Sequence, residues 1–490
     1  MSSKYKIHST KYNFLMNIIL KMSSFIFPMI TFPYISRVLL ATGNGKVAFA
    51  TSVINYFVLI ATLGIPTYGV KACAEIRDDN EQLNKTVHEL LFINIICMCI
   101  SYILFVILMF LVPEFQEDRI LLWITSISIF LGSLGVEWFY QAIEQYDYIT
   151  FRNIAFKIIS IILMFAFVHT KEDFIIYGAI NVIGTYGSNI LNIIRLPRYI
   201  SFHRYNNYNI RKHLQPIIML FLYSAATTIY TNLDVVMLGF MSGDIQVGYY
   251  NAAVKLKNVL VSIVTALGSV MMPRVAYYLK NKLQIEFQNI IKKSFSFIFL
   301  ISMPLAIYFT SESDAIINFL AGEGYNNAIL TMQIITPSIV FIGISSITAW
   351  QLLIPLGNNK YTVIGAILGA IIDLILNSLL IPYMGSAGAA IGTLVAEITV
   401  VIVHFKVLYK IVKPCIINKN IIKILLSSII AYLPYMLISS LEYQLIILRL
   451  IYTSIAYFGI YLLLLLIFKE KIVVENVNNI KTLMIKKHKS

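Results

Sequence analysis

The chain consists mainly of continuous apolar runs, and this feature restricts its fold more than any other. Each run is long enough to cross a bilayer as an α-helix, which takes about 20 residues. Membrane strands would instead show alternating segments of about 10 residues. The sequence therefore predicts an all-α integral membrane protein with fourteen transmembrane helices. The expected spans lie near residues 14–36, 47–65, 86–112, 119–140, 149–168, 173–194, 214–239, 247–270, 290–310, 329–355, 361–381, 385–405, 420–440 and 445–468.

The composition excludes a soluble enzyme. Hydrophobic residues make up 58% of the chain and charged residues 13%, whereas a soluble protein carries about 25% charged residues. The net charge of +14 would suggest nucleic acid in a soluble protein, but the basic residues are spread over many short loops, so we expect no nucleic-acid partner. The four cysteines form no Cys-x-x-Cys pair, and we expect no disulfide framework, metal or cofactor.

The distribution of Lys and Arg predicts the orientation. With a cytoplasmic amino terminus, 29 of the 38 basic residues fall in inner segments and 4 in outer loops. The other 5 lie inside spans. Cytoplasmic loops carry an excess of Lys and Arg. We therefore expect a multi-pass protein of the cytoplasmic membrane with both termini in the cytoplasm.

Two segments of the chain are similar at a shift of 200 residues. Thr42-Gly43-Asn44 matches Ser242-Gly243-Asp244, and weaker similarities occur at a shift of 212. This spacing predicts two six-helix lobes, residues 1–195 and 196–410, followed by a terminal helix pair and tail at 411–490. An even number of helices places both lobes in the same orientation, with a substrate site expected between them.

Four motifs carry a family resemblance. They are Pro33 to Leu39 (PYISRVL), Glu137 to Gln141 (EWFYQ), Asn232 to Gly239 (NLDVVMLG) and Val247 to Ala253 (VGYYNAA). In these motifs the chain resembles the bacterial polysaccharide and O-antigen flippases, of the superfamily that exports drugs, oligosaccharide-linked lipids and polysaccharides. The resemblance spans nearly the whole chain. The chain departs from the family at Leu40, where the family has glycine, so the outer hairpin there could differ in shape.

The resemblance implies a fold shared with multidrug extrusion proteins and with the lipid II flippase. It also implies a function, the transfer of undecaprenyl-pyrophosphate-linked oligosaccharide units of O-antigen or capsule from the inner to the outer leaflet by alternating access. The implied partners are this polyprenyl-linked substrate, membrane lipid, a polysaccharide polymerase and the chain-length machinery. The implied location is the inner membrane of a bacterium.

Charged residues at membrane depth are the candidate substrate site, because each costs about 2.5 to 3.5 kcal/mol in lipid. Lys255 shares one helical face with other polar residues, and the pyrophosphate of the substrate needs cations to replace its hydration. The alternative is that each lysine pairs with a buried carboxylate or extends to the interface. The predicted substrate-binding residues of the central cavity are Lys255, Lys157, Lys21, Asn251, Asn258 and Asn55.

Five further residues are candidates for gating and coupling. Arg37, Glu137 and Asp234 lie at or near span ends and are predicted gate residues, although Arg37 could be an interface anchor. Glu397 and Asp373 lie inside spans and could carry the coupling ion. Neighbouring glycines four residues apart favour a different role for these two carboxylates, that of joining two closely packed helices.

Two other classes of function compete with the flippase. A multidrug antiporter of the same fold would present acidic residues to organic cations, but the first lobe offers lysines at mid-depth. A membrane-embedded polysaccharide polymerase would be an enzyme and needs a catalytic outer loop. The longest outer loop, residues 310–328, holds Glu312, Asp314 and Glu323 as its acid or base residues. We therefore expect a transporter and not an enzyme.

Overall fold

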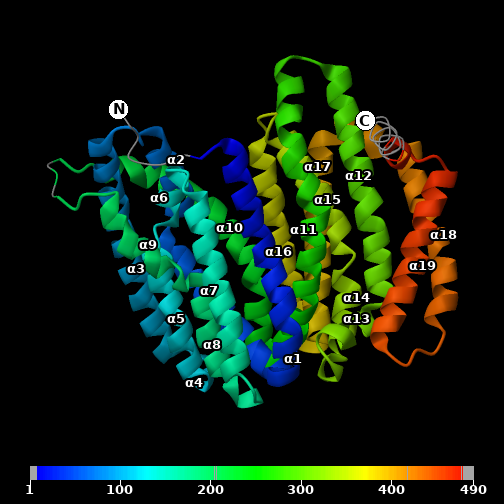
Figure 1. Cartoon of the computed structure of the whole chain (residues 1–490), viewed down its shortest axis with the longest axis horizontal. Coiled ribbons are helices and arrows are strands. Elements are labelled where there is room, and N and C mark those ends of the chain that lie inside the picture. Colours follow the sequence, from blue (N-terminus) through cyan, green and yellow to red (C-terminus); the bar gives the residue numbers. More distant parts are fainter. Residues whose placement is uncertain (1–7, 204, 206, 417, 476, 478–490) are drawn as a thin grey trace, which may run out of the picture. The chain divides into compact units, whose positions relative to one another are not determined.

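The chain forms two compact helical units, Met1–Gly248 and Tyr249–Ser490 (Figure 1). The computed structural model describes residues 8–203, 205, 207–416, 418–475 and 477. Every regular element in those ranges is helical, so the all-α fold class is confirmed. The division into lobes and a terminal pair stays a prediction.

The first unit is built from ten α-helices and from short 3-10 and π segments among its described residues. The α-helices are α1 (Thr10–Thr62), α2 (Ile65–Glu75), α3 (Asn80–Leu111), α4 (Glu114–Glu117), α5 (Arg119–Leu134), α6 (Glu137–Ala142), α7 (Tyr146–Phe167), α8 (Phe174–Val182), α9 (Asn189–Arg195) and α10 (Arg211–Ser242). Five of them, α1, α3, α5, α7 and α10, have 16 or more residues, and the other five are shorter.

Helix α1 contains a sharp break at Leu40. Its 53 residues exceed what one span needs, and Leu40 has φ 56° and ψ −174°. This backbone conformation is essentially restricted to glycine and costs about 1 to 3 kcal/mol for other residues. Leu40 is the position at which the sequence departs from the glycine of the resembling family. The conformation explains why glycine suits this position, and the break divides α1 into helices 10–39 and 41–62.

The second unit contains most of α11 and all later helices. It also holds the π segment η5 (Ile347–Leu353), which continues α15. The predicted outer loop 310–328 is largely helical, since it contains α13 and the 3-10 turn η4 (Glu323–Tyr325). The α-helices are α11 (Asp244–Lys280), α12 (Gln284–Ser311), α13 (Ser313–Leu320), α14 (Ala328–Ile335), α15 (Ser338–Ser346), α16 (Asn359–Met384), α17 (Ser386–Ile416), α18 (Lys419–Ser439) and α19 (Ile446–Ile467).

Ten helices of the described chain are long and apolar enough to cross a membrane, and twelve if each of two bent pairs counts as one span. The bent pairs are Lys171–Gly187 with Asn189–Arg198, and Arg211–Leu222 with Thr227–Ser242. The count of fourteen stays a prediction.

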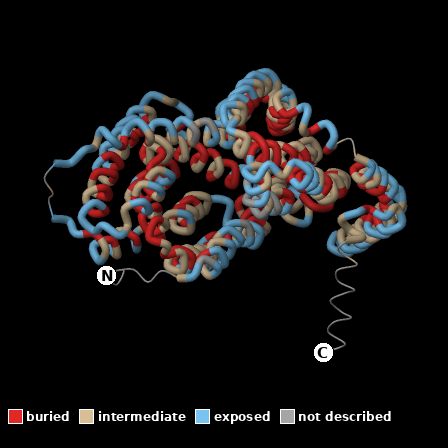
Figure 2. Tube along the Cα trace, turned by 90° about the horizontal axis from the view of Figure 1, so that it is seen from above, coloured by how far each residue is buried: buried red, intermediate tan, exposed pale blue. Residues whose placement is uncertain are grey.

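The outward faces of these helices are apolar, as expected for contact with lipid. On α3, Phe92, Ile96 and Ile103 are exposed, while Leu90 and Phe105 are fully buried. On other helices too, buried residues lie on one side of the helix and exposed residues on the other (Figure 2). Exposed apolar surface of this extent marks a membrane-facing protein.

Candidate functional site

Lys157 is a cation of the first unit that is held without a carboxylate. It lies in α7, and its Nζ donates hydrogen bonds to the hydroxyl oxygens of Ser23 at 2.9 Å and Ser24 at 3.0 Å. The ammonium also lies 5.7 Å from the centre of the Phe27 ring. Within the described ranges, no acidic oxygen lies within 4.0 Å of Lys157. Because neutral hydroxyls do not cancel its charge, Lys157 can bind an anionic ligand.

Lys21 and Asn55 lie in the two parts of α1. Lys21 is exposed, so it is accessible to a ligand. Asn55 is half-buried, and its Nδ2 donates a long hydrogen bond of 3.4 Å to Oδ1 of Asn232 in α10. The structure therefore uses Asn55 to link two helices of the first unit.

The predicted gate residue Glu137 forms an ion pair with the buried Arg152. Nη2 of Arg152 lies 2.5 Å from Oε2 of Glu137. Nη1 of Arg152 donates to Ser188 Oγ at 3.0 Å and to Asn189 Oδ1 at 2.9 Å. The guanidinium thereby joins α6 and α7 to the start of α9.

The other two predicted gate residues lie on different helices. Arg37 in α1 is exposed, and its Nη1 donates to the Pro33 carbonyl oxygen one turn earlier at 2.7 Å. Asp234 in α10 is 4% exposed.

In the second unit, the polar face predicted on α11 is the accessible face of that helix. Asn251 and Lys255 are half-buried, and Asn258 is exposed. Leu256 and Leu260 point into the core from the other side of the helix. The role of these three residues in substrate binding stays a prediction.

Asp373 lies at a tight interface between α16 and α17. A Cβ added to Gly392 of α17 would lie 2.4 Å from Oδ1 of Asn377 and 2.8 Å from Oδ1 of Asp373, so only glycine fits there. Asp373 is 1% exposed, and Glu397 in α17 is 9% exposed. The close packing expected from the spacing of small residues is found. The coupling role of the two carboxylates stays a prediction.

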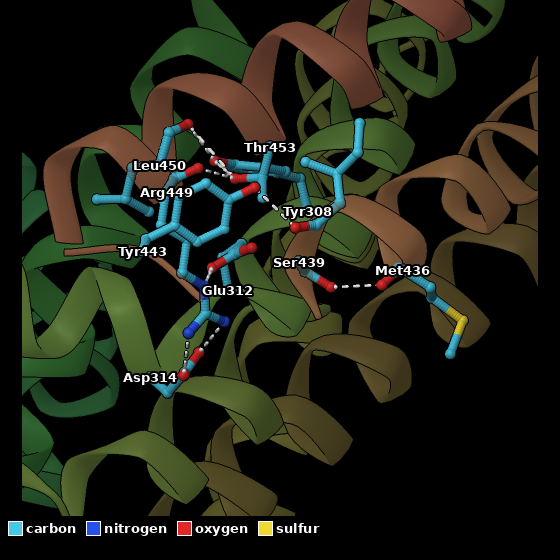
Figure 3. Close-up of polar contacts among 10 residues, drawn as sticks. Tyr308, Glu312, Asp314, Met436, Ser439, Tyr443, Arg449, Leu450 and Thr453 are labelled. Carbon is cyan, nitrogen blue, oxygen red and sulfur yellow. Dashed lines mark hydrogen bonds and ion pairs between the residues drawn. The ribbon is translucent and has the colours of Figure 1, made fainter. Parts of the chain in front are cut away.

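A cluster of charges in the second unit, where α12 meets α13 and α19, was not predicted from the sequence (Figure 3). Nε of Arg449 in α19 lies 3.1 Å from Oε2 of Glu312, which is fully buried at the junction of α12 and α13. Nη1 and Nη2 of Arg449 donate to the two carboxylate oxygens of Asp314 at 3.0 and 3.2 Å. Burial raises the pKa of Glu312, and the guanidinium of Arg449 opposes this rise. In the sequence, only the position of Arg449 inside a predicted span pointed to this cluster.

A second group of residues that was missed joins the two similar hairpins. Nζ of Lys46 lies 2.7 Å from Asp118 Oδ1 and 3.8 Å from Asp244 Oδ2. A Cβ on Gly45 would lie 1.8 Å from the Asp244 carbonyl oxygen, and one on Gly248 would lie 2.0 Å from the carbonyl oxygen of Ala41. The two segments that match at a shift of 200 residues therefore touch backbone to backbone. Glycine is required at both contacts because any larger residue would separate the helices.

The long apolar helices are those of a helical membrane protein, and comparisons with known proteins give its family. A family model described as "Polysaccharide biosynthesis protein" matches residues 11–279, more than half of the chain. The chain belongs to this family of polysaccharide biosynthesis proteins.

Its relatives include two bacterial proteins named as candidate O-antigen transporters. The one from Escherichia coli K12 is 25% identical over 378 residues, which cover 76% of this chain and 91% of the relative. The one from Shigella dysenteriae is 27% identical over 406 residues, 81% of this chain and 99% of the relative. The family resemblance predicted from the motifs is confirmed, as is the prediction of a transporter instead of an enzyme.

Solved structures of two transporters share the fold. The lipid II flippase MurJ in an inward closed conformation has a TM-score of 0.75 and 18% identity, over 94% of this chain and all of its own. An inward-facing multidrug transporter of the MATE family has a TM-score of 0.60 and 12% identity, over 81% of this chain and 99% of its own. The expected likeness to both types of protein is confirmed at the level of the fold.

Proposed function

We propose that the chain is a flippase that moves undecaprenyl-pyrophosphate-linked oligosaccharide units, of O-antigen or capsule type, from the inner to the outer leaflet. Its family membership and the names of its relatives support a lipid-linked polysaccharide precursor as substrate. The observation that carries the proposal is Lys157. This cation lies in an apolar helix and is held by hydroxyl groups instead of a carboxylate, so its charge is available to the pyrophosphate.

Lys255 supplies a second cation, from the other unit of the chain. A pyrophosphate that leaves water loses its hydration, and at least two cations are needed to replace it. The amide side chains of Asn251 and Asn258 lie on the same accessible face of α11 as Lys255. Amides can donate to phosphate and to sugar hydroxyls. We therefore assign these residues, with Lys157 and Lys21, to the path of the head group.

Deletion of the gene tests the proposed function. The deletion strain should accumulate lipid-linked oligosaccharide on the cytoplasmic leaflet and lose surface polysaccharide, and the wild-type gene supplied in trans should restore both. Normal surface polysaccharide in the deletion strain would overturn the proposal.

A multidrug antiporter is the second candidate, because the MATE-type structure shares the fold. Such a transporter needs accessible acidic residues for organic cations. In the first unit, the predicted gate carboxylate Glu137 is already paired with Arg152. Sensitivity of the deletion strain to cationic drugs, with unchanged surface polysaccharide, would favour this candidate over the flippase.

We also propose fourteen spans. The twelve that length and composition allow become fourteen if the long helix Lys11–Glu75 is divided at Leu40 and if α11 is added. The described ion pairs support this topology. Lys46 with Asp118 joins two residues that it places outside, and Lys293 with Glu475 joins two that it places on the inner side. Arg449 lies near the outer end of the last predicted span and pairs with Glu312, which the topology places outside.

Cysteine labelling tests the orientation with both termini in the cytoplasm. Ser313 in the predicted outer loop is fully buried and unsuitable as a label site, whereas Asn326 in the same segment is exposed. In a cysteine-free background, Asn326→Cys should react with an impermeant thiol reagent in intact cells, and Lys419→Cys only after lysis. Equal reaction of both before lysis would refute the orientation.

Alternating access is part of the proposal. The backbone contacts at Gly45 and Gly248, with the ion pairs of Lys46, support a state in which the outer side of the hairpins is closed. Export then requires these contacts to open, and Arg37, Glu137 and Asp234 are proposed to act with them as gates. Gly248→Val should separate the hairpins and reduce export at a normal protein level. Full export by this variant would contradict a role for the contact in gating.

We further propose that transport is coupled to an ion through Glu397 and Asp373. Both carboxylates are at least nine-tenths buried in α17 and α16, and ionisable residues inside spans often mark ion pathways. Glu397→Gln or Asp373→Asn should abolish gradient-driven transport in vesicles and leave substrate binding largely unchanged. Full driven transport by both single variants would reduce the two residues to a packing role.

A further inference from the structure

A cavity of about 460 Å³ lies within the first unit, on the side that the proposed topology assigns to the cytoplasm. Its volume is within the range of about 300 to 1,000 Å³ of small-molecule sites. The described residues that line it come from α1, α2, α3, α5, α6 and α9, and more than half of them are polar. They include Thr67, Asn94, Trp138, Gln141 and Asn189.

The indole of Trp138 is fixed in the wall of this cavity. A Cβ added to Gly69 of α2 would lie 2.6 Å from Cε3 of Trp138, so the ring packs directly on the helix backbone. Trp138 is 4% exposed and also contacts Phe139 edge to face. A ring held in this way offers a rigid surface to a ligand with little loss of side-chain entropy.

Two buried polar atoms of the lining have no hydrogen-bond partner among the described residues. They are Nε1 of Trp138, a donor, and Oδ1 of Asn94, an acceptor. Asn94 is 2% exposed, and its Nδ2 donates to the Ser133 carbonyl oxygen. A buried polar atom without a partner costs about 1 to 3 kcal/mol. The two atoms are shielded by their own neighbours, while the lining also carries the hydroxyl of Thr67 and the amide of Gln141, which can donate to and accept from a polar ligand.

The charges of the lining favour a neutral ligand. Its one carboxylate, Glu137, accepts from Arg152 at 2.5 Å and from Gln141 at 3.2 Å, so its charge is already compensated. The described lining contains no lysine or arginine that could bind phosphate. The described lining therefore offers no unpaired charged side chain to an organic cation or to an anion. A neutral molecule with hydroxyl groups and an apolar face matches the hydroxyls, amides and indole of the wall.

We propose that this cavity binds one neutral sugar residue of the lipid-linked oligosaccharide on the cytoplasmic side, before the pyrophosphate engages the lysines. The inference rests on the proposed function, and it adds a sugar subsite to the path of the head group. Asn94, Trp138 and Gln141 are the residues expected to contact the sugar. Thr67, on the exposed side of α2, lies where a larger side chain would fill the cavity.

Tryptophan fluorescence tests this inference directly. The chain has 3 tryptophans, and the variant Trp123→Phe/Trp350→Phe keeps Trp138 as the sole reporter. The full-length protein in lipid nanodiscs is titrated with N-acetylglucosamine, galactose and rhamnose, and separately with inorganic pyrophosphate and tetraphenylphosphonium. At least one sugar should change the Trp138 emission saturably. Pyrophosphate and tetraphenylphosphonium should not.

Substitutions in the wall locate the binding event. Thr67→Phe should weaken sugar binding at least tenfold, and Gln141→Leu should weaken it several-fold. The control Asn181→Leu changes a half-buried amide of α8 that lies outside the cavity, and it should bind sugar normally. The emission spectrum of Trp138 without ligand reports whether each variant is folded.

Three outcomes would overturn the sugar subsite. They are the absence of any saturable response to sugars, sugar binding that Thr67→Phe leaves unchanged, and tetraphenylphosphonium binding that Thr67→Phe abolishes. The gene deletion separates this result from the proposed function. If the deletion strain loses export but the purified protein binds no sugar, the subsite is wrong and the proposed function stands. If the purified protein binds sugar but the deletion strain exports normally, the cavity is a sugar site in a transporter of another substrate.

Discussion

Replacement of Arg449 by leucine should strongly destabilise the second unit. Glu312 is fully buried and would lose the guanidinium that lies 3.1 Å from its carboxylate. Breaking a buried ion pair by removal of one partner costs about 3 to 5 kcal/mol, because the other charge stays buried. The measurement is the thermal unfolding of the purified protein in detergent, together with its amount in the membrane.

Two further variants show whether the buried charge is the cause. Asp314 is 44% exposed, so Asp314→Asn should cost less than about 1 kcal/mol, as exposed pairs do. The double variant Arg449→Leu/Glu312→Gln carries no buried charge and should recover much of the loss. If the double variant is as unstable as Arg449→Leu, packing and not charge is the reason.

The stability of Arg449→Leu should also depend on pH. Burial raises the pKa of Glu312, and Arg449 opposes this rise, so removal of Arg449 raises the pKa further. Above the ordinary glutamate pKa of 4.5, the unfolded chain has released this proton while the folded variant still holds it. Stability of the variant should therefore fall as pH rises above that value and recover on acidification. A flat profile relative to wild type would contradict this account.

Elements that depend on local sequence could be predicted. The apolar runs gave the positions of the long helices, since a span is specified by its own residues. The glycine spacing of 365, 369, 388 and 392 likewise predicted the tight contact of α16 with α17, which is found at Gly392 and Asp373. The departure at Leu40 was visible in the sequence, and its consequence, a positive φ in α1, required the backbone.

Contacts between distant parts of the chain could not be predicted. Arg449 and Asp314 are 135 residues apart, and nothing in either segment specifies the other. The cavity beside Trp138 is equally hidden, because its wall combines six helices of the first unit. The sequence predicted a charge inside a span at Lys157, and only the structure showed that its neighbours are the hydroxyls of Ser23 and Ser24. A single sequence thus identifies candidate charges but not their neutralisation.

Removal of the charge at Lys157 or Lys255 should nearly silence export. One charge-assisted contact to phosphate is worth about 1.5 to 3 kcal/mol. Because each 1.4 kcal/mol is a factor of ten, its loss should lower the population of protein with the pyrophosphate bound at mid-membrane roughly tenfold or more. Lys157→Met and Lys255→Met keep the length of the side chain and remove its charge. Surface polysaccharide, normalised to the amount of protein in the membrane, should fall at least tenfold in each.

Arginine at the same positions separates charge from packing. Lys157→Arg and Lys255→Arg should retain part of the export, because the charge survives although the geometry of its donors differs. The control Lys410→Ala alters an exposed lysine in the last two turns of α17 and should export normally. A purely structural lysine gives another pattern, in which the methionine variants are scarce in the membrane but each remaining molecule exports at the normal rate. Normal export by Lys157→Met at a normal protein level would remove Lys157 from the substrate path, and with it the observation on which the proposed function rests.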